Sequence, residues 1–293
     1  MRRRHFLKSA AVATAAALPA VGLPAFSQGA EEPKKCKLLG IGACDWTLKL
    51  AANTESLDLA KRIGLDGVQV DFGHEVQANG KLPLHDEKLQ EAFLAKSAET
   101  GVKVPSLALG VLNRVAYKND ENAKQWVLDS MPVAKRLKTP VVLLAFFGNG
   151  DLRNDEPGIE AVIARLKELA PRAEEAGIVY GIESWLKAEV LERMLDAVKS
   201  PSIKVYYDVG NMHKESEDIH AAVRRLGRER ICEFHAKDYD DLYGKGSIDF
   251  AKVRADMDAI GYTGWIHIEG VKIPHGVEED IRYDVEYLRK TFA

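Results

Sequence analysis

Short apolar runs alternate with segments of helical periodicity along most of the chain. In the helical segments apolar residues recur at spacings of three and four, as in Leu57, Ala60 and Ile63. Several of these segments end on a glycine that leads into the next apolar run, as at Gly64 and Gly101. The apolar runs that read as β-strands are Leu38–Ala43, Gly67–Asp71, Val104–Leu109, Val141–Phe146, Ile178–Glu183, Lys204–Asp208, Ile231–His235 and Trp265–Glu269.

This alternation predicts parallel βαβ units, and eight such units close into a barrel. The expected fold is therefore α/β, a single (β/α)₈ TIM barrel over residues 31–293. After about Pro33 no linker rich in proline or serine divides the chain. An open doubly wound sheet is the runner-up, but no Gly-x-Gly-x-x-Gly turn follows the first strand.

Residues 1–30 read as a leader rather than as part of the fold. The segment Arg3-Arg4-His5-Phe6-Leu7-Lys8 is a twin-arginine pattern, and an Ala-rich apolar run from Ala10 to about Ala25 follows it. The run is short and broken by prolines, which favours a cleavable signal peptide over a membrane anchor. We therefore expect a periplasmic or extracellular protein, exported by the twin-arginine route, with no stable membrane insertion after cleavage.

Charge limits the partners of the mature protein. The leader carries four basic residues and no acid, so its removal shifts the formal net charge of the 293-residue chain from −3 to about −7. An acidic chain lacks the positive surface that nucleic acid binding requires. We therefore expect no nucleic acid partner, a small-molecule substrate and, among protein partners, at most a second copy of the chain in a homo-oligomer.

The last four predicted strands each stop on a side chain that can bind a metal. These residues are Glu183, Asp208, His235 and Glu269, separated by 25, 27 and 34 residues. Each separation is about one βα unit, so all four come to the carboxyl ends of neighbouring strands, where barrel enzymes place their active sites. Three carboxylates and one imidazole favour a single divalent ion such as Mn²⁺, Mg²⁺, Co²⁺ or Zn²⁺. A set of polar residues that merely mark strand ends is the alternative reading.

The sequence resembles the sugar phosphate isomerase/epimerase superfamily of xylose-isomerase-like barrels. The motifs that carry the resemblance are Gly-Ile-Glu183, Asp208-Val-Gly-Asn211, His235-Ala-Lys237-Asp238 and the stretch from Gly261 to Glu269. The resemblance implies that the four strand-end residues are metal ligands, and that Glu183 and Glu269 also move protons. The implied reaction is isomerisation or epimerisation of a carbohydrate or keto-sugar, by proton abstraction α to a carbonyl through an enediolate.

Two other activities fit the same residues. A metal-dependent lyase or dehydratase would eliminate a group from a keto-sugar, inosose or keto-glycoside after the same proton abstraction. A barrel that only binds carbohydrate is the third possibility, although an intact ligand set favours an enzyme.

The substrate pocket is expected to differ from that of the ketose epimerases. Those enzymes carry a histidine where this chain has Asn211, and an arginine where it has Asp241. His213 and Lys237 are therefore candidates for substrate binding together with Asn211. Three further candidates for substrate binding follow other predicted strands: Trp46 the first, Glu75 the second and Trp185 the fifth. The two tryptophan rings could stack on a sugar. Asp249 is expected to cap a helix rather than to act in catalysis.

Overall fold

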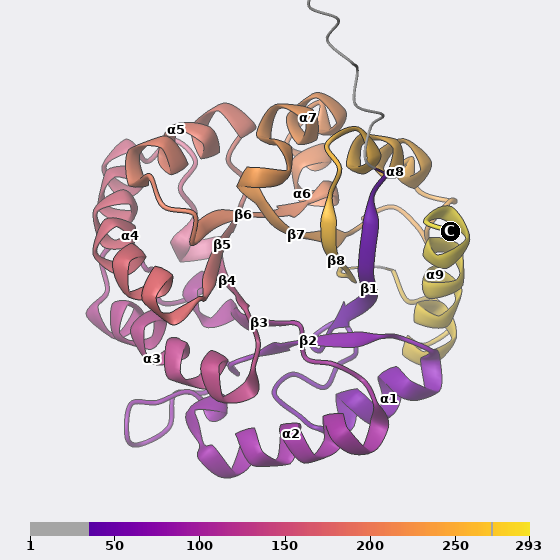
Figure 1. Cartoon of the computed structure of the whole chain (residues 1–293), viewed down its shortest axis with the longest axis horizontal. Coiled ribbons are helices and arrows are strands. Elements are labelled where there is room, and N and C mark those ends of the chain that lie inside the picture. The colour runs from indigo at the N-terminus through magenta and orange to yellow at the C-terminus, as the bar shows by residue number, and fades with distance from the viewer. Residues whose placement is uncertain (1–34, 271) are drawn as a thin grey trace, which may run out of the picture. The chain divides into compact units, whose positions relative to one another are not determined.

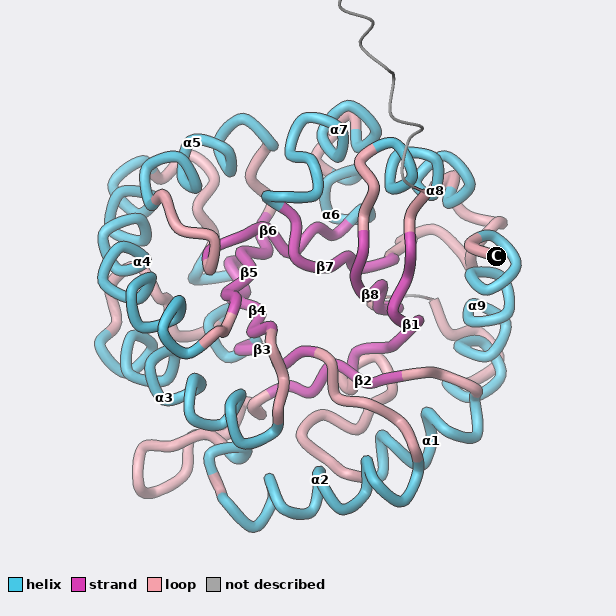
Figure 2. The backbone as a smooth tube through the Cα atoms, in the orientation of Figure 1, coloured by secondary structure: helices cyan, strands magenta, loops and turns pink. Residues whose placement is uncertain are grey.

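Eight parallel strands form a closed barrel in which the strand order follows the sequence order, from β1 to β8. The computed structural model describes residues 35–270 and 272–293. These residues belong to one unit, Pro33–Ala293. Figure 1 looks down the barrel, with the helices in a ring around the strands. Figure 2 shows the same arrangement with strands and helices in different colours. The predicted α/β barrel is confirmed, whereas the predicted leader lies outside the described residues.

The strands lie close to the positions that the apolar runs predict. Their bounds are β1 Lys37–Cys44, β2 Gly67–Asp71, β3 Ser106–Leu109, β4 Val141–Phe146, β5 Val179–Ser184, β6 Ile203–Asp208, β7 Ile231–Ala236 and β8 Thr263–Ile268. β3 begins two residues later than predicted, after Pro105, which has no N–H to contribute to a strand ladder.

The helices fill the connections between the strands. Their bounds are α1 Glu55–Ile63, α2 Glu87–Thr100, α3 Glu121–Leu137, α4 Glu156–Ala176, α5 Ala188–Val198, α6 Val209–Lys214, α7 Ile219–Arg230, α8 Phe250–Ala259 and α9 Val277–Thr291. Three short 3₁₀ helices also lie in the connections: η1 Pro83–His85, η2 Gly110–Asn113 and η3 Gly148–Gly150. In the part of the chain that the structure describes, no helix has the length and apolar character needed to cross a membrane.

Local signals in the sequence explain where helices begin and end. Gly64 and Gly101 follow α1 and α2 with φ angles of 92° and 78°, a left-handed conformation that stops a helix at little cost in glycine. Asp249 caps α8 by accepting hydrogen bonds from the backbone N–H groups of Ala251 and Lys252. The prediction that Asp249 is a helix cap is therefore confirmed.

The barrel interior contains a layer of buried polar side chains next to the carboxyl ends of the strands. Tyr206, Glu233 and His267 lie two residues before Asp208, His235 and Glu269, so on each strand they face the same side as those residues. The Tyr206 hydroxyl donates to Glu233 Oε2 at 2.9 Å and lies 2.9 Å from His267 Nδ1. Burial raises the pKa of Glu233 to about 7. This hydrogen-bonded layer lies directly next to Asp208, His235 and Glu269 along their strands.

Candidate metal centre and active site

The four predicted ligands come together at the carboxyl ends of β5 to β8. One ligand atom from each of Glu183, Asp208, His235 and Glu269 lies within 4.8 Å of the others. Glu183 and His235 lie within their strands, Asp208 ends β6, and Glu269 directly follows β8. The N–H of Glu269 donates to the carbonyl of Ala236 at 2.9 Å, which extends the pairing of β7 and β8 up to this side chain.

Three of the four cluster residues are buried, Glu269 is partly buried, and their charges lie close enough to influence one another. Glu183 and Asp208 are 5 % and 2 % exposed, and His235 is fully buried. Burial raises the pKa of Glu183, and the neighbouring His235 only partly opposes this effect. For Asp208 burial acts in the same direction, but Lys237, His235 and the N–H of Asn211 together lower the pKa to about 2. The site therefore combines an ionised carboxylate with one that is easily protonated.

The donor set fits a divalent cation. Asp208 Oδ2 is buried and has no hydrogen-bond partner among the described residues, which is costly for a carboxylate oxygen unless a cation compensates it. Its neighbours include Lys237 Nζ at 3.4 Å and His235 Nδ1 at 3.7 Å. Carboxylate oxygens and one imidazole nitrogen are suitable ligands for Mn²⁺, Mg²⁺, Co²⁺ or Zn²⁺.

His235 is oriented by a residue on β2. Its Nε2 lies 2.7 Å from Gln69 Oε1, and its Nδ1 faces Glu183 Oε1 at 3.2 Å. Because the amide oxygen can only accept a hydrogen bond, it holds a proton on Nε2. Burial opposes a charge on the ring, but Glu183 and Asp208 raise the pKa of His235 well above its ordinary value, so that a metal would replace the proton on Nδ1. The Sγ of Cys44 lies 3.4 Å from the same Nε2. The His235 ring is therefore oriented so that Nδ1 faces the carboxylates and can bind a metal, while Nε2 donates to Gln69.

Lys237 and Asn211 link the carboxylates on the side facing the pocket. Lys237 is 7 % exposed, and its Nζ contacts Glu269 Oε2 and lies 3.3 Å from Asn211 Oδ1. Asn211 Nδ2 donates to Glu183 Oε1 at 3.1 Å, and the hydroxyl of Tyr239 donates to Asn211 Oδ1. Burial opposes the charge on Lys237, but Asp208 and Glu269 raise its pKa well above the ordinary value. Lys237 is therefore a fixed positive charge at the edge of the cluster.

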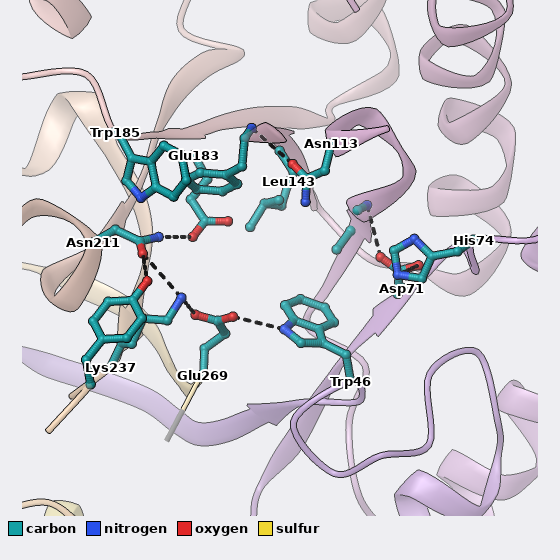
Figure 3. A pocket seen from close by; sticks show the side chains of 15 residues that line it. Trp46, Asp71, His74, Asn113, Leu143, Glu183, Trp185, Asn211, Lys237 and Glu269 are labelled. Carbon is teal, nitrogen blue, oxygen red and sulfur yellow. Dashed lines mark hydrogen bonds and ion pairs between the residues drawn. The ribbon is translucent and has the colours of Figure 1, made fainter. Parts of the chain in front are cut away.

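A cavity of about 300 Å³ opens above the cluster (Figure 3). Trp46, Phe147 and Trp185 form an aromatic wall, with Trp46 Nε1 donating to Glu269 Oε1 at 3.1 Å. The Phe147 and Trp185 rings meet edge to face with centroids 4.9 Å apart. Trp185 Nε1 is buried without a hydrogen-bond partner among the described residues. Apolar ring faces with a few polar groups are typical of carbohydrate sites.

The structure separates the predicted substrate-binding residues into two groups. Those that line the cavity are Asn211, Lys237, Trp46 and Trp185. Glu75 and His213 are exposed and do not line it. His213 lies on α6 only two residues after Asn211, and this spacing places the two side chains on different faces of the helix. Glu75 lies in the loop after β2, where the neighbouring His74 lines the cavity instead.

Several residues of the site are not among those that the sequence singles out. Asp71, His74 and Asn113 line the cavity, and the Gln69 side chain contacts His235. Gln69 and Asp71 alternate along β2, where both read as part of an ordinary strand. A polar residue inside a predicted barrel strand is the one signal that could identify Gln69, because such positions face either the barrel interior or the helices.

The sequence profile of the family described as "Xylose isomerase-like TIM barrel" matches residues 57–291. The chain belongs to this family. Among its curated relatives is the putative L-ribulose-5-phosphate 3-epimerase SgbU of Escherichia coli K12. That relative is 24 % identical over 243 residues, which cover 73 % of this chain and 82 % of the relative. A D-psicose 3-epimerase of Enterocloster bolteae is 28 % identical over 123 residues, 39 % of this chain and 40 % of the relative. These relatives support an enzyme of the isomerase or epimerase type.

Solved structures show the same fold. The 3-keto-D-glucoside 4-epimerase of E. coli aligns with a TM-score of 0.72 and 17 % identity, covering 85 % of this chain and 98 % of that one. The D-psicose 3-epimerase of Clostridium cellulolyticum H10, solved with D-tagatose, aligns with a TM-score of 0.72 and 14 % identity, covering 87 % and 99 %. At these identities the likeness concerns the barrel alone.

Proposed function

We propose that this protein is a divalent-metal-dependent isomerase or epimerase that acts on a keto-sugar by removing a proton α to the carbonyl. The observation that carries the proposal is the convergence of Glu183, Asp208, His235 and Glu269 on one point beneath the cavity. Membership of a family whose curated relatives include sugar epimerases supports it.

A bound divalent ion supplies Lewis-acid polarisation of the carbonyl and the adjacent hydroxyl. The chain supplies the proton transfers. Glu183 and Glu269 both line the cavity, and they come from β5 and from the end of β8. One glutamate removes the α proton and the other returns a proton, which gives an epimer or an isomer according to the carbon that receives it. Burial raises the pKa of Glu183, which makes it a stronger base than an exposed glutamate.

Two neighbouring residues orient these glutamates, and a third stabilises the negative charge that develops on the substrate. Asn211 donates to Glu183, and Trp46 donates to Glu269, so each carboxylate keeps one oxygen fixed. The Lys237 ammonium group lies at the cavity wall, where a positive charge stabilises an enediolate oxygen in a site largely shielded from water. The same proton abstraction can lead to loss of a β substituent, which is the lyase alternative.

Deuterium exchange tests the proposal and separates these outcomes. We expect the Mn²⁺-loaded protein in D₂O to incorporate deuterium at the carbon α to the carbonyl of a keto-sugar, with the product retained as a sugar. Release of a substituent with formation of an enone would identify a lyase instead. Glu183→Gln should abolish the exchange, while Glu160→Gln, on an exposed position of α4, should leave it intact. Exchange that persists in Glu183→Gln contradicts the proposed role of Glu183.

We also propose that the mature protein works outside the cytoplasm after twin-arginine export. The Arg3-Arg4 pair of the leader supports this location. Replacing both arginines with lysine should retain the full-length precursor in the cytoplasmic fraction. A periplasmic mature form of that variant would contradict twin-arginine export.

A further inference from the structure

The cavity has a second polar end, away from the carboxylate cluster. Asp71 and His74 line this end, and Figure 3 shows them on the opposite side of Trp46 and Leu143 from Glu269 and Glu183, with Asn113 next to Leu143. The two polar ends are thus separated by an apolar middle. A volume of about 300 Å³ lies in the range of sites that take drug-sized ligands, which are larger than one monosaccharide.

Asp71 is held rigidly at this end. It is 1 % exposed, Oδ1 accepts the N–H of Gly73 at 2.6 Å, and Oδ2 accepts the N–H of Gly110 at 3.0 Å. Its own N–H donates to Asp45 Oδ2 at 3.0 Å. Each carboxylate oxygen has a second lone pair that can accept a hydrogen bond from a ligand hydroxyl. A side chain fixed in this way binds a ligand without losing rotamer freedom.

His74 adds a donor beside Asp71, and Asn113 adds one on the cavity wall next to Leu143. His74 Nε2 lies 3.8 Å from Asp71 Oδ1, and its side chain is 51 % exposed, so the ring remains available to a ligand. Asn113 uses its Oδ1 to accept the N–H of Phe147 at 3.0 Å. This bond fixes the amide so that the Nδ2 group remains as a donor. Acceptors and donors side by side match the hydroxyl groups of a sugar ring.

Gly110 keeps this end open. A Cβ atom at Gly110 would lie 2.6 Å from Asp71 Oδ2 and 2.9 Å from His74 Cε1, closer than packed atoms tolerate. Its φ angle is not in the left-handed region, so backbone conformation does not require a glycine here. The requirement is instead steric, because any side chain at Gly110 would displace the two residues that face the ligand.

Among the described residues no lysine or arginine lines the far end, and the exposed Arg114 next to it donates its guanidinium N–H to the His74 carbonyl. Among the residues that line the cavity, Lys237 is the only lysine or arginine, and it is engaged by Asp208 and Glu269 at the other end. Arg153 packs over the Trp185 ring at 4.2 Å, but Asp151 and Glu215 pair with its guanidinium group. A phosphate at the far end would face the Asp71 carboxylate, which is repulsive.

We propose that Asp71, His74 and Asn113 form a subsite for the hydroxyl groups of a second sugar unit, so that the substrate is an uncharged glycoside or disaccharide rather than a phosphate ester. This inference rests on the function proposed for the carboxylate cluster. It assigns the reacting keto-sugar ring to the cluster and the neighbouring ring to the far end. The aromatic wall of Trp46, Phe147 and Trp185 then covers the link between the two rings.

The test compares three substrates with the Mn²⁺-loaded protein: 3-keto-glucose, its 6-phosphate and 3-keto-sucrose. We expect kcat/KM for 3-keto-sucrose to exceed that for the other two by roughly tenfold or more, the effect of one or two hydrogen bonds. Asp71→Asn and Gly110→Ala should lower kcat/KM for 3-keto-sucrose more than that for 3-keto-glucose, so that the ratio of the two values falls to within about threefold of one. Gln77→Ala, an exposed position in the same loop as His74, is the matched control.

A preference for the phosphate, or an unchanged advantage of 3-keto-sucrose in both variants, overturns the subsite. Lack of deuterium exchange with all three substrates overturns the proposed function instead. Calorimetry with unreactive sucrose and glucose 6-phosphate then tests the subsite separately. Sucrose binding that Asp71→Asn weakens supports the subsite, whereas glucose 6-phosphate binding more tightly than sucrose overturns it. Circular dichroism of each variant confirms that it is folded.

Discussion

Replacement of Gln69 by leucine should weaken metal binding although Gln69 is not a ligand. Gln69 Oε1 accepts the Nε2 proton of His235 at 2.7 Å, and both side chains are fully buried. When a metal takes the Nδ1 lone pair of His235, the proton must remain on Nε2. In Gln69→Leu that N–H has only the Sγ of Cys44 nearby, a weak acceptor at 3.4 Å.

The loss of metal affinity equals the difference between what the substitution costs the metal-bound site and what it costs the metal-free site. Without a metal, burial opposes a charge on His235, but the neighbouring acids raise its pKa. In the variant the ring can nevertheless release its Nε2 proton and donate from Nδ1 to Glu183 Oε1 at 3.2 Å, so no buried donor is left unpaired. With a metal bound, the unpaired Nε2–H costs about 1–3 kcal/mol. This penalty applies only to the metal-bound form, so it weakens affinity by roughly 5- to 150-fold. Losses of about 10- to 100-fold are typical when an outer partner of a histidine ligand is removed.

Calorimetric titration of Mn²⁺ into wild type and Gln69→Leu measures this difference directly. Gln90→Leu is the matched control. Gln90 lies on α2, is 3 % exposed, and donates a hydrogen bond to the Leu84 carbonyl at 2.9 Å, away from the cluster. We expect the control to lower thermal stability but to bind Mn²⁺ like wild type. Equal Mn²⁺ affinity in Gln69→Leu and wild type would refute the reasoning, as would an equal loss in both variants.

Three further predictions follow from the structure. Chelation with EDTA should lower the melting temperature by roughly 5–10 °C relative to protein in Mn²⁺ at one hundred times its Kd, as measured by scanning calorimetry. Trp46→Phe keeps an aromatic, though smaller, ring and removes the hydrogen bond to Glu269 Oε1, so kcat should fall roughly tenfold while Mn²⁺ affinity stays within about threefold of wild type. Burial raises the pKa of Asp284 to about 7. A raised pKa stabilises the fold at low pH, and this stability is lost as the pH rises through 7. Urea unfolding should therefore show a decline from pH 5 to pH 8 that is about 3 kcal/mol smaller in Asp284→Asn than in wild type.

The fold could be predicted because apolar runs and helix ends carry local signals. Buried parallel strands read as continuous apolar runs, and β2 and β4 have the bounds that these runs predict. The carboxyl ends of neighbouring parallel strands meet at one face of a barrel, so topology alone brought together Asp208, His235 and the two glutamates. Strand order therefore gave the candidate metal centre without any knowledge of side-chain contacts.

The other residues of the pocket could not be predicted in full, because the local sequence pattern does not specify which way their side chains point. Asn211 points into the cavity and His213 does not, although both lie on α6. Asp71 and His74 reach the far end from β2 and from the loop after it, and their positions depend on the absence of a side chain at Gly110. Such contacts join residues about 40 positions apart in the sequence, and a single sequence shows only that polar residues occur there.

The most direct test of the account is deuterium exchange measured during a titration of metal-free protein with Mn²⁺. With 3-keto-sucrose in D₂O, exchange at the carbon α to the carbonyl should be absent without metal and rise in proportion to added Mn²⁺. It should reach a plateau at about one ion per chain, because the four residues form a single site. Exchange at the full rate in EDTA-treated protein, or in the metal-loaded Asp208→Asn variant, would contradict the assignment of this cluster as the metal centre.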